Sequence, residues 1–451
     1  MKRSHKVKSL LEILFVIGLI LIIPLFFAIR SLAGSQAAPT IAAPVVPTAM
    51  QDTEPLTTVA AKQPPQCTFP LAQITIAEST PEEYTFSEPQ AVLTAPEGNY
   101  YGIVEWLPDN QQVLITEALR ANFVIQNDNY PQQSINLFNP ETGEMKVYAI
   151  RAETGYLPFW QSDLNAVVYP AVNFYQLDRK NQIAKFTRQI WVSYGNPDTA
   201  QLLDDNLTQF PATSKPDGSD IIYLSDKKIA KLDKSLRKLT SSLFDPIQWD
   251  YAKDRRSKDP VSYEMAWQPG TSLVFLYNDG AIKEGGYTFI LNTDTGQICE
   301  LNLGGWADQA HWSSDGRYLA FIRSVDYSFP INSSDLTILD TMTGNLVTLT
   351  TPPLETEGKH YVDGFVWAPD NRHLLVIGSI SLLKYNEHQT GLYLVDFVSG
   401  QSVHVASEYE SSLSSQNANL AWSPDGSKVL IRCPLPVADQ LCLVSVQETG
   451  Q

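Results

Sequence analysis

The amino-acid sequence predicts an all-β fold, and three observations lead to this prediction. A phrase like "LAWSPDGSKVLI" at residues 420–431 recurs along residues 84–451. A second pair of strand signals follows each copy, and no helical period separates the pairs. Four antiparallel strands in each repeat are typical of a β-propeller blade. We therefore expect a seven-bladed β-propeller over residues 84–451, preceded by one transmembrane helix.

The first hairpin of each repeat has a turn signal at a fixed place. Proline presets φ for a turn, and Asp and Gly tolerate the conformations that follow. Successive turn positions are 54, 54, 53, 45, 55 and 55 residues apart, and Trp precedes six of the seven turns. We interpret the Trp as packing between blades and the turn aspartates as structural, because chemistry needed once would not recur in every blade. These positions are Asp109, Asp163, Asp217, Gly270, Asp315, Asp370 and Asp425.

The second hairpin of most repeats has a glycine where a residue at positive φ closes the turn. These glycines are Gly143, Gly296, Gly344, Gly400 and Gly450. The seventh repeat ends at Gln451 just after this turn and lacks its fourth strand. Residues 89–95 align with a fourth strand, so we expect them to complete the last blade and close the ring. Closure removes open sheet edges, which otherwise invite edge-to-edge pairing.

The N-terminal segment has the features of a membrane anchor. Residues 10–29 are apolar with a single charge, Glu12, and about 20 apolar residues suffice to cross a bilayer. Four basic residues precede the span, so residues 1–9 are expected in the cytoplasm and the propeller outside it. A cleavable signal peptide, which would leave the body secreted, is the alternative, since "SLAGSQAA" offers small residues for processing. Residues 30–83 are rich in Pro, Ala and Thr and are interpreted as a disordered tether.

Charge and composition exclude several function classes. The chain has 49 acidic and 32 basic residues, a net charge of −17, so nucleic acid is not an expected partner. His is scarce and the four Cys residues lack metal-ligand spacing, so neither a structural metal nor a cofactor is expected. Cys433 and Cys442 flank a short connection, and a disulfide between them is plausible in an exported protein. Cys67 and Cys299 can be free or paired.

The longer connections between strands share one face of the predicted propeller, opposite the tight turns. Loops on a rigid scaffold carry binding more often than strands do, and Tyr, Trp and Arg anchor interfaces. The alternative is that these side chains pack against their own loops. The candidate binding residues are Phe174, Tyr175, Trp249, Tyr251, Arg255, Arg256, Tyr327, Tyr361 and Tyr385.

The Trp-Ser-Pro-Asp-Gly phrase, followed by Leu-x-x-Asp-x-x-Thr-Gly, resembles the WD40-like (PD40-type) repeat of the TolB-like propeller family. The resemblance covers about residues 84–451 and implies a β-propeller fold. TolB-type propellers usually have six blades and an added N-terminal α/β domain, and this sequence has neither feature. The resemblance therefore carries fold rather than a particular partner.

Three hypotheses for function follow. The first is a membrane-anchored extracytoplasmic propeller that binds a protein, peptide or glycan of the cell envelope, with no enzymatic activity. The second is a propeller-based hydrolase or lyase with its site at the channel mouth, although the sequence has no G-x-S-x-G motif. The third is an extracytoplasmic sensor domain, which would need a separate cytoplasmic partner.

Overall fold

The computed structural model describes the chain over fourteen ranges, all within one compact unit of residues 61–451. The predicted tail 1–9 and the predicted span 10–29 lie outside the described residues. Among the described residues, no helix has the length and apolarity needed to cross a bilayer. The ranges are 64–72, 83–119, 132–153, 157–178, 183–207, 212–225, 228–244, 264–277, 288–324, 334–349, 359–382, 387–407, 420–434 and 439–448.

The described part of the chain is all-β, as expected, and its named strands form antiparallel sheets. Four of the sheets contain four strands, each sheet formed by consecutive strands in chain order. The first two sheets are β11 (Ala212–Ser214), β12 (Asp220–Ser225), β13 (Lys228–Asp233), β14 (Lys238–Phe244), and β15 (Glu264–Trp267), β16 (Leu273–Tyr277), β17 (Thr288–Asn292), β18 (Ile298–Leu301). The next two are β19 (Trp306–Trp312), β20 (Tyr318–Ser324), β21 (Asp335–Asp340), β22 (Leu346–Leu349), and β23 (Lys359–Trp367), β24 (His373–Leu382), β25 (Glu387–Asp396), β26 (Gln401–Ser407).

A larger sheet of eight strands has two halves. Strands β3–β6 and strands β7–β10 each repeat the four-strand pattern, and the pair Ala152–Ala171 joins β6 to β8. Two short 3-10 helices, η2 (Ser162–Leu164) and η3 (Pro197–Thr199), follow β7 and β9. The strands are β3 (Asn99–Trp106), β4 (Val113–Leu119), β5 (Gln132–Phe138), β6 (Met145–Glu153), β7 (Phe159–Gln161), β8 (Ala166–Asp178), β9 (Ile183–Ser193) and β10 (Gln201–Leu207).

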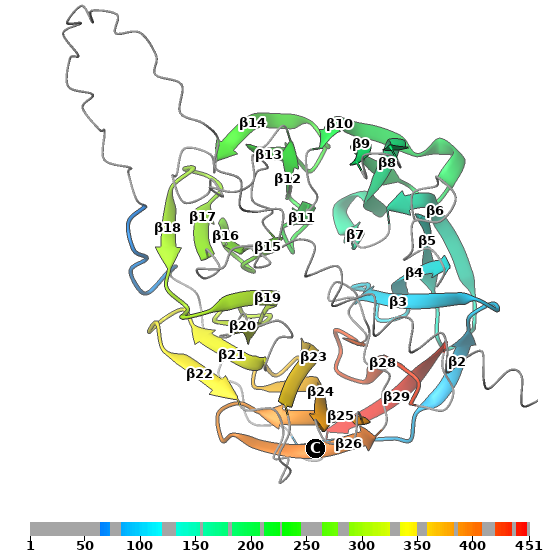
Figure 1. The fold of residues 1–451 in the computed structure, drawn as a ribbon, viewed down its shortest axis with the longest axis vertical. Coiled ribbons are helices and arrows are strands. Elements are labelled where there is room, and N and C mark those ends of the chain that lie inside the picture. Colours follow the sequence, from blue (N-terminus) through cyan, green and yellow to red (C-terminus); the bar gives the residue numbers. More distant parts are fainter. Residues whose placement is uncertain are drawn as a thin grey trace, which may run out of the picture. The chain divides into compact units, whose positions relative to one another are not determined.

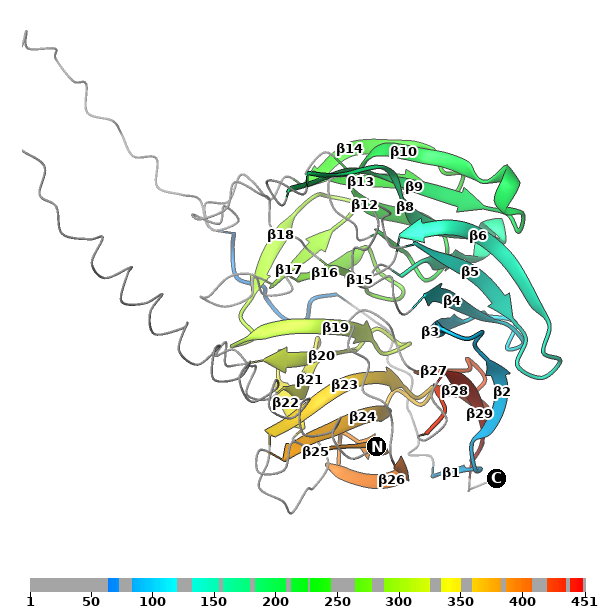
Figure 2. The same cartoon turned by 45° about the vertical axis from the view of Figure 1, so that its right-hand side comes forward.

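The last sheet joins the first strands of the described chain to its last strands. Strands β27 (Leu420–Trp422), β28 (Lys428–Arg432) and β29 (Gln440–Glu448) are completed by β2 (Gln90–Thr94), which pairs with the first part of β29. This pairing agrees with the closure expected for residues 89–95. A second N-terminal strand, β1 (Tyr84–Phe86), pairs with the other end of β29 and was not predicted. Figure 2 shows both strands beside β29.

The sheets follow one another around a ring, with the first strand of each sheet innermost (Figure 1). Three of the repeated Trp residues form hydrogen bonds between neighbouring sheets. In each case the indole N–H donates to a backbone carbonyl in the previous sheet, and the acceptor is the residue directly before that sheet's own repeated Trp. Trp106 donates to Ala421 at 2.9 Å, and this bond connects the two ends of the repeat array. Trp312 donates to Ala266, and Trp367 donates to His311. Trp267 and Trp422 instead donate to carbonyls of their own turns.

The turn aspartates hold their own hairpins. Asp109 Oδ1 accepts from the backbone N–H groups of Gln111 and Gln112 at 2.9 and 3.0 Å. Asp217, Asp315, Asp370 and Asp425 accept from the N–H two residues further on. Asp163 differs, because it lies inside η2. In the second hairpins, Gly143, Gly296, Gly344 and Gly400 have φ between 69° and 79°, while Gly450 lies outside the described residues.

The apolar core lies between consecutive sheets. Ile222 and Leu224 of β12 share a cluster with Trp267 of the next sheet. The same arrangement holds where the ring closes, since Ile103 of β3 shares a cluster with Ala421 of β27. Both faces of each sheet therefore have neighbours, which explains why the second strands are continuous apolar runs such as "LVFLY" in β16.

Residues 64–72, which we call the strap, fall inside the predicted tether but are fixed to the sheets. Gln66 forms a parallel bridge with Glu300 of β18, and Cys67 forms a disulfide with Cys299. The prediction of a disordered segment up to residue 83 is therefore wrong for the strap. Its proline-rich composition suggested disorder, but a covalent bond and its apolar residues Phe69 and Leu71 attach it to the propeller.

Candidate functional site

Most of the predicted binding residues lie outside the described part of the chain. This group comprises Trp249, Tyr251, Arg255, Arg256, Tyr327 and Tyr385. The three that can be placed are Phe174 and Tyr175 on β8 and Tyr361 on β23. These two strands belong to different sheets, and both carry the residues in their loop-side parts.

The β8–β9 hairpin is the longest in the described chain. Its strands have 13 and 11 residues, and their pairing continues to Asp178 and Ile183. Phe174 pairs with Thr187 and Tyr175 with Phe186, beyond the last pair that β9 makes with β10, which is Leu207–Arg188. This end of the hairpin therefore extends past the outer strand of its own sheet.

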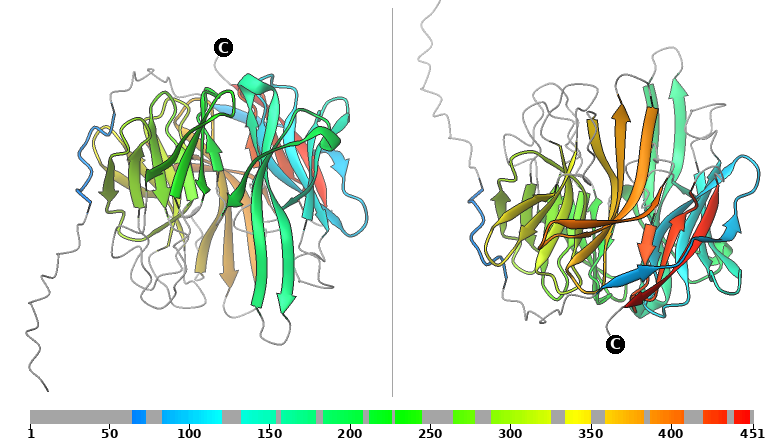
Figure 3. Two further views of the ribbon diagram at one scale, coloured as in Figure 1. Left: turned by 90° about the horizontal axis from the view of Figure 1, so that it is seen from above. Right: turned by 90° about the horizontal axis from the view of Figure 1, so that it is seen from below.

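The β24–β25 hairpin extends in the same way. Each strand has 10 residues, and the pairing continues to Leu382 and Glu387. The pair Gly391–Ser407 is the last that β25 makes with β26 at this end, so the first part of β25, residues 387–390, lies beyond the outer strand. Figure 3 shows both long hairpins projecting on the same side of the propeller. This is the side of the longer connections, as their places between second and third strands require.

A buried salt bridge fastens the base of the β8–β9 hairpin. Arg188 Nε donates to both carboxylate oxygens of Glu153 at 2.8 and 2.9 Å, and both side chains are buried. Gln133 Nε2 donates to the Glu153 carbonyl. Because Glu153 belongs to β6 and Arg188 to β9, the pair connects the two halves of the eight-stranded sheet. The hairpin therefore projects from a fixed base.

Carboxylates lie on the loop-side half of the innermost strands, and Tyr277 at the end of the second strand β16 pairs with one of them, Glu264 of β15. The Tyr277 hydroxyl donates to Glu264 Oε2 at 2.8 Å and accepts from the backbone N–H of Ala310 at 3.1 Å. Burial, followed by the nearby carboxylates of Glu264 and Asp308, raises the pKa of Tyr277 well above its usual value. Tyr277 therefore stays protonated and serves as a fixed donor to Glu264.

Tyr361 lies on β23, the first strand of the sheet that follows the β19–β22 sheet. Burial, followed by the negative charge of Asp363, raises the pKa of Tyr361. Gln309 of β19 reaches the Asp363 carbonyl through its side-chain amide at 3.4 Å. Both β19 and β23 have a β-bulge near these residues, at Asp308–His311 and Val362–Gly364. Bulges redirect side chains beside functional sites, and here they occur where the carboxylates lie.

The residue before the repeated Trp is a titratable group in two inner strands. In β3 it is Glu105, whose Oε1 accepts from the Trp160 backbone N–H at 2.7 Å. In β19 it is His311, whose ring contacts Phe365 edge-on at 5.3 Å between centroids. Burial raises the pKa of Glu105 to about 7, while the bond from Trp160 opposes this rise. Desolvation by the surrounding strands lowers the pKa of His311 to about 4, although the side chain itself has an exposed surface.

Sequence reasoning missed the inner residues Glu105, Glu264, Asp308 and Asp363. Each lies within a few residues of the repeated Trp, in phrases such as "ADQAHW" and "VDGFVW". A polar residue in an otherwise apolar inner strand was the available signal. Within the described ranges, no group of three or more His, Cys, Asp or Glu residues is arranged to hold a metal ion.

No family model matches the chain, and no curated protein matches it. Several solved structures are similar to the chain. An oligogalacturonate lyase in complex with manganese has a TM-score of 0.51 at 12% identity, covering 82% of this chain and 99% of that one. The oligogalacturonate lyase of Vibrio parahaemolyticus has a TM-score of 0.51 at 10% identity, covering 82% and 98%. TolB from Acinetobacter baumannii has a TM-score of 0.36 at 11% identity, covering 72% and 78%.

These similarities concern the fold. The described part of the chain has a β-propeller fold, which is the fold that the resemblance of its turn phrases implies. At these identities the activity of the neighbours does not transfer to this chain.

Proposed function

We propose that this protein is a membrane-anchored, extracytoplasmic, seven-bladed β-propeller that binds a protein, peptide or glycan of the cell envelope. The two halves of the eight-stranded sheet count as two blades, and the four four-stranded sheets are four more. The sheet closed by β1 and β2 is the seventh blade. The bond from Trp106 to Ala421 supports this count, because it repeats between the first and last groups the contact that Trp312 and Trp367 make between neighbours.

The disulfides support the extracytoplasmic location. The chain has four Cys residues, and all four are paired, as Cys67–Cys299 and Cys433–Cys442. Structural disulfides persist in oxidising compartments and are rare in the cytoplasm of mesophiles. Export is also what the predicted N-terminal anchor would bring about.

The observation that carries the binding proposal is the pair of long hairpins on the loop side (Figure 3). Elsewhere in the described chain, second and third strands mostly have five to seven residues, whereas β8, β9, β24 and β25 have 10 to 13. Strands that extend beyond their sheet contribute little to the core between sheets. A role in contacting a partner explains the extra length, because the rigid sheets below hold the hairpins in place.

A lyase is the second candidate, because the oligogalacturonate lyases share the fold. Charge disfavours the substrate in their name, since Glu264, Asp308 and Asp363 lie on inner strands of a chain with a net charge of −17. Such a surface repels an acidic oligosaccharide. A neutral glycan or a peptide fits this chemistry better, because carboxylates and tyrosines accept and donate hydrogen bonds to hydroxyl and amide groups.

Site-specific photocrosslinking in intact cells tests the binding proposal. A photoreactive residue would replace Tyr175 or Tyr361 on the loop side, or Glu144 on the opposite, tight-turn side. We expect the same partner to be captured from both loop-side positions and not from position 144. The triple change Trp249→Ala, Tyr251→Ala and Arg255→Glu should reduce capture if these loop residues take part. Equal capture from both sides would contradict the assignment of the binding face.

Hydrolysis or elimination activity on envelope glycans, lost on Glu264→Gln but retained by Glu144→Gln, would favour the enzyme instead. A sensor role would require a separate membrane partner that copurifies through the N-terminal segment.

A further inference from the structure

The strap fills a space on the outer side of the propeller, which we call the groove and define by the residues on either side that contact the strap. One wall is the edge of β18, and the other is the turn between β21 and β22. Cys67 N–H donates to the Glu300 carbonyl and Glu300 N–H donates to the Pro65 carbonyl, each at 2.9 Å. Further along, Leu71 N–H donates to the Thr341 carbonyl at 3.0 Å. The strap therefore pairs with the sheet edge in the manner of an added strand.

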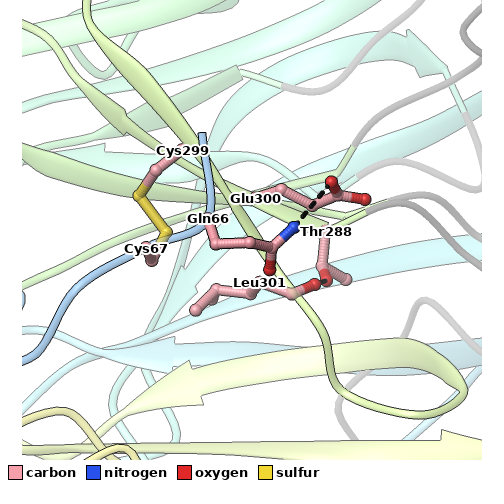
Figure 4. Close-up of a disulfide and its surroundings, with 6 residues drawn as sticks. All are labelled: Gln66, Cys67, Thr288, Cys299, Glu300 and Leu301. Carbon is pink, nitrogen blue, oxygen red and sulfur yellow. Dashed lines mark hydrogen bonds between the residues drawn. A yellow bond between two sulfur atoms is a disulfide. The ribbon is translucent and has the colours of Figure 1, made fainter. Parts of the chain in front are cut away.

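Side chains and one covalent bond complete the contact. Gln66 Nε2 donates to Glu300 Oε2 at 3.0 Å, beside the Cys67–Cys299 disulfide (Figure 4). Phe69 and Leu71 pack against the cluster between the β15–β18 and β19–β22 sheets. The Phe69 ring lies so close to Gly344 that a Cβ at residue 344 would be 2.6 Å from Phe69 Cδ2. The glycine thus leaves room for the ring as well as closing its turn.

All the contacts just named come from residues 65–71 of the strap. The same contacts could be made by the strap of another chain. A strap that is linked to its own groove has only the advantage of a higher local concentration. Exchange of an identical element between two copies is a low-cost route to a dimer.

We propose that the groove between β18 and the β21–β22 turn is a binding site for an extended peptide, occupied here by the chain's own strap, and that the strap of a second copy can occupy it. The second copy then becomes joined through Cys67 of one chain and Cys299 of the other. This inference does not depend on the ligand of the loop side.

The covalent step is an ordinary thiol oxidation. With glutathione disulfide as the oxidant, one glutathione forms a mixed disulfide with a protein thiol and the other leaves as a thiol. The second protein thiol then displaces the bound glutathione. The Cys67–Cys299 bond forms, two glutathione thiols carry away the two protons, and the two protein thiols are oxidised while one glutathione disulfide is reduced.

Two complementary variants of the full chain test the proposal. Cys299→Ser supplies a strap with a free Cys67, and Cys67→Ser supplies a groove with a free Cys299. Mixed in glutathione redox buffer, they should give a disulfide-linked heterodimer whose digest contains the Cys67–Cys299 crosslink. Phe69→Ser added to the Cys299→Ser protein should lower the yield about tenfold, since burying a Phe side chain contributes more than the 1.4 kcal/mol that a tenfold change represents.

The groove has a matched control. Gly344→Ala in the Cys67→Ser protein should lower the heterodimer yield because the methyl group meets Phe69, whereas Gly400→Ala should leave it unchanged. Both glycines have positive φ, 79° and 71°, but a Cβ at residue 400 meets nothing within 4 Å. Equal losses from the two changes would overturn the groove assignment. A dimer linked mainly through two Cys67 residues, no dimer, or a yield unaffected by Phe69→Ser would overturn the exchange.

Discussion

Two contacts between neighbouring four-strand groups, which we call joints, place different titratable residues at the same repeat position. At the β3–β7 joint, Glu105 accepts from the Trp160 backbone N–H. At the β19–β23 joint, His311 lies against Phe365, and its carbonyl accepts from Trp367. Both residues come directly before the repeated Trp and contact the following group. The repeat therefore determines where this side chain lies but not which residue type it is. Because the pKa of Glu105 is raised and that of His311 is lowered, the stability of the two joints should change with pH in opposite directions.

Loss of the Trp in a joint should have the largest effect. Trp367→Ala removes a buried indole and its bond to His311, so we expect the free energy of unfolding to fall by about 3–5 kcal/mol. Denaturant unfolding followed by circular dichroism measures this change. Tyr194→Ala is the control at a more exposed aromatic residue and should change stability much less. A similar loss from both would show that the joint contributes no particular stability.

The Glu105 joint should lose stability as pH rises. Its pKa in the folded protein is about 7 against an ordinary 4.5, so the folded state holds the proton more tightly. Stability is fully present below pH 4.5 and falls until pH passes 7, by about 3 kcal/mol at 1.36 kcal/mol for each pKa unit. Glu105→Gln should remove this loss and raise stability at pH 8 relative to wild type, as measured by urea unfolding at pH 5 and pH 8. Glu144→Gln, at an exposed turn, should leave the profile unchanged.

The His311 joint should respond in the opposite direction. Its pKa in the folded protein is about 4 against an ordinary 6.5, so the unfolded state takes up the proton first as pH falls. Stability is fully present above pH 6.5 and decreases as pH falls to 4, but only by a fraction of the full conversion of the pKa shift, because the His311 side chain is exposed and solvent screens its charge. His311→Gln should flatten the profile between these values, and His404→Gln on the outer strand β26 is the matched control. An unchanged slope in the His311 variant would refute the assignment.

Loss of the indole donor alone should have the smallest effect. Trp367→Phe keeps most of the ring but removes the bond to the neighbouring sheet, and about 1 kcal/mol should be lost. Trp267→Phe removes a bond to Thr271 in the same turn and should cost a similar amount. Hydrogen exchange separates the two variants: protection should fall in β19 for the first and only in the β15–β16 hairpin for the second.

Much of the fold could be predicted because its signals are local. The turn at Asp425 takes its bonds from Ser427 and from its own hairpin, so a few consecutive residues define it. Seven such phrases then define the period. Glu105 shows the limit, because its altered pKa depends on burial against a strand about 55 residues away, and sequence spacing does not reveal that burial. The strap was missed for the same reason, since Cys67 and Cys299 are 232 residues apart.

The candidate site was less accessible to prediction. The aromatic residues in the loops indicated which side of the propeller to consider. The lengths of β8 and β24 could not be predicted, because both strands continue pairing past the end of the outer strand and no turn signal marks where that outer strand ends. Tyr361 was chosen for its place in a loop and lies instead within β23. The bulge at Asp308–His311 contains no glycine or proline that could reveal it, and Gly364 beside Asp363 was a local signal that the sequence analysis did not use.

The closing sheet also sets the order in which the protein can be made. Strands β3 to β26 pair mainly with neighbours in the sequence, so these sheets can form as the chain emerges. Strand β2 must wait for β29, which is synthesised about 350 residues later, roughly 20–70 s at about 5–20 residues per second. Until then the nascent chain has the unpaired edge of β2 at one end and an unfinished sheet at the other. A chain that is truncated before β29 therefore leaves β2 without its partner and the last sheet open.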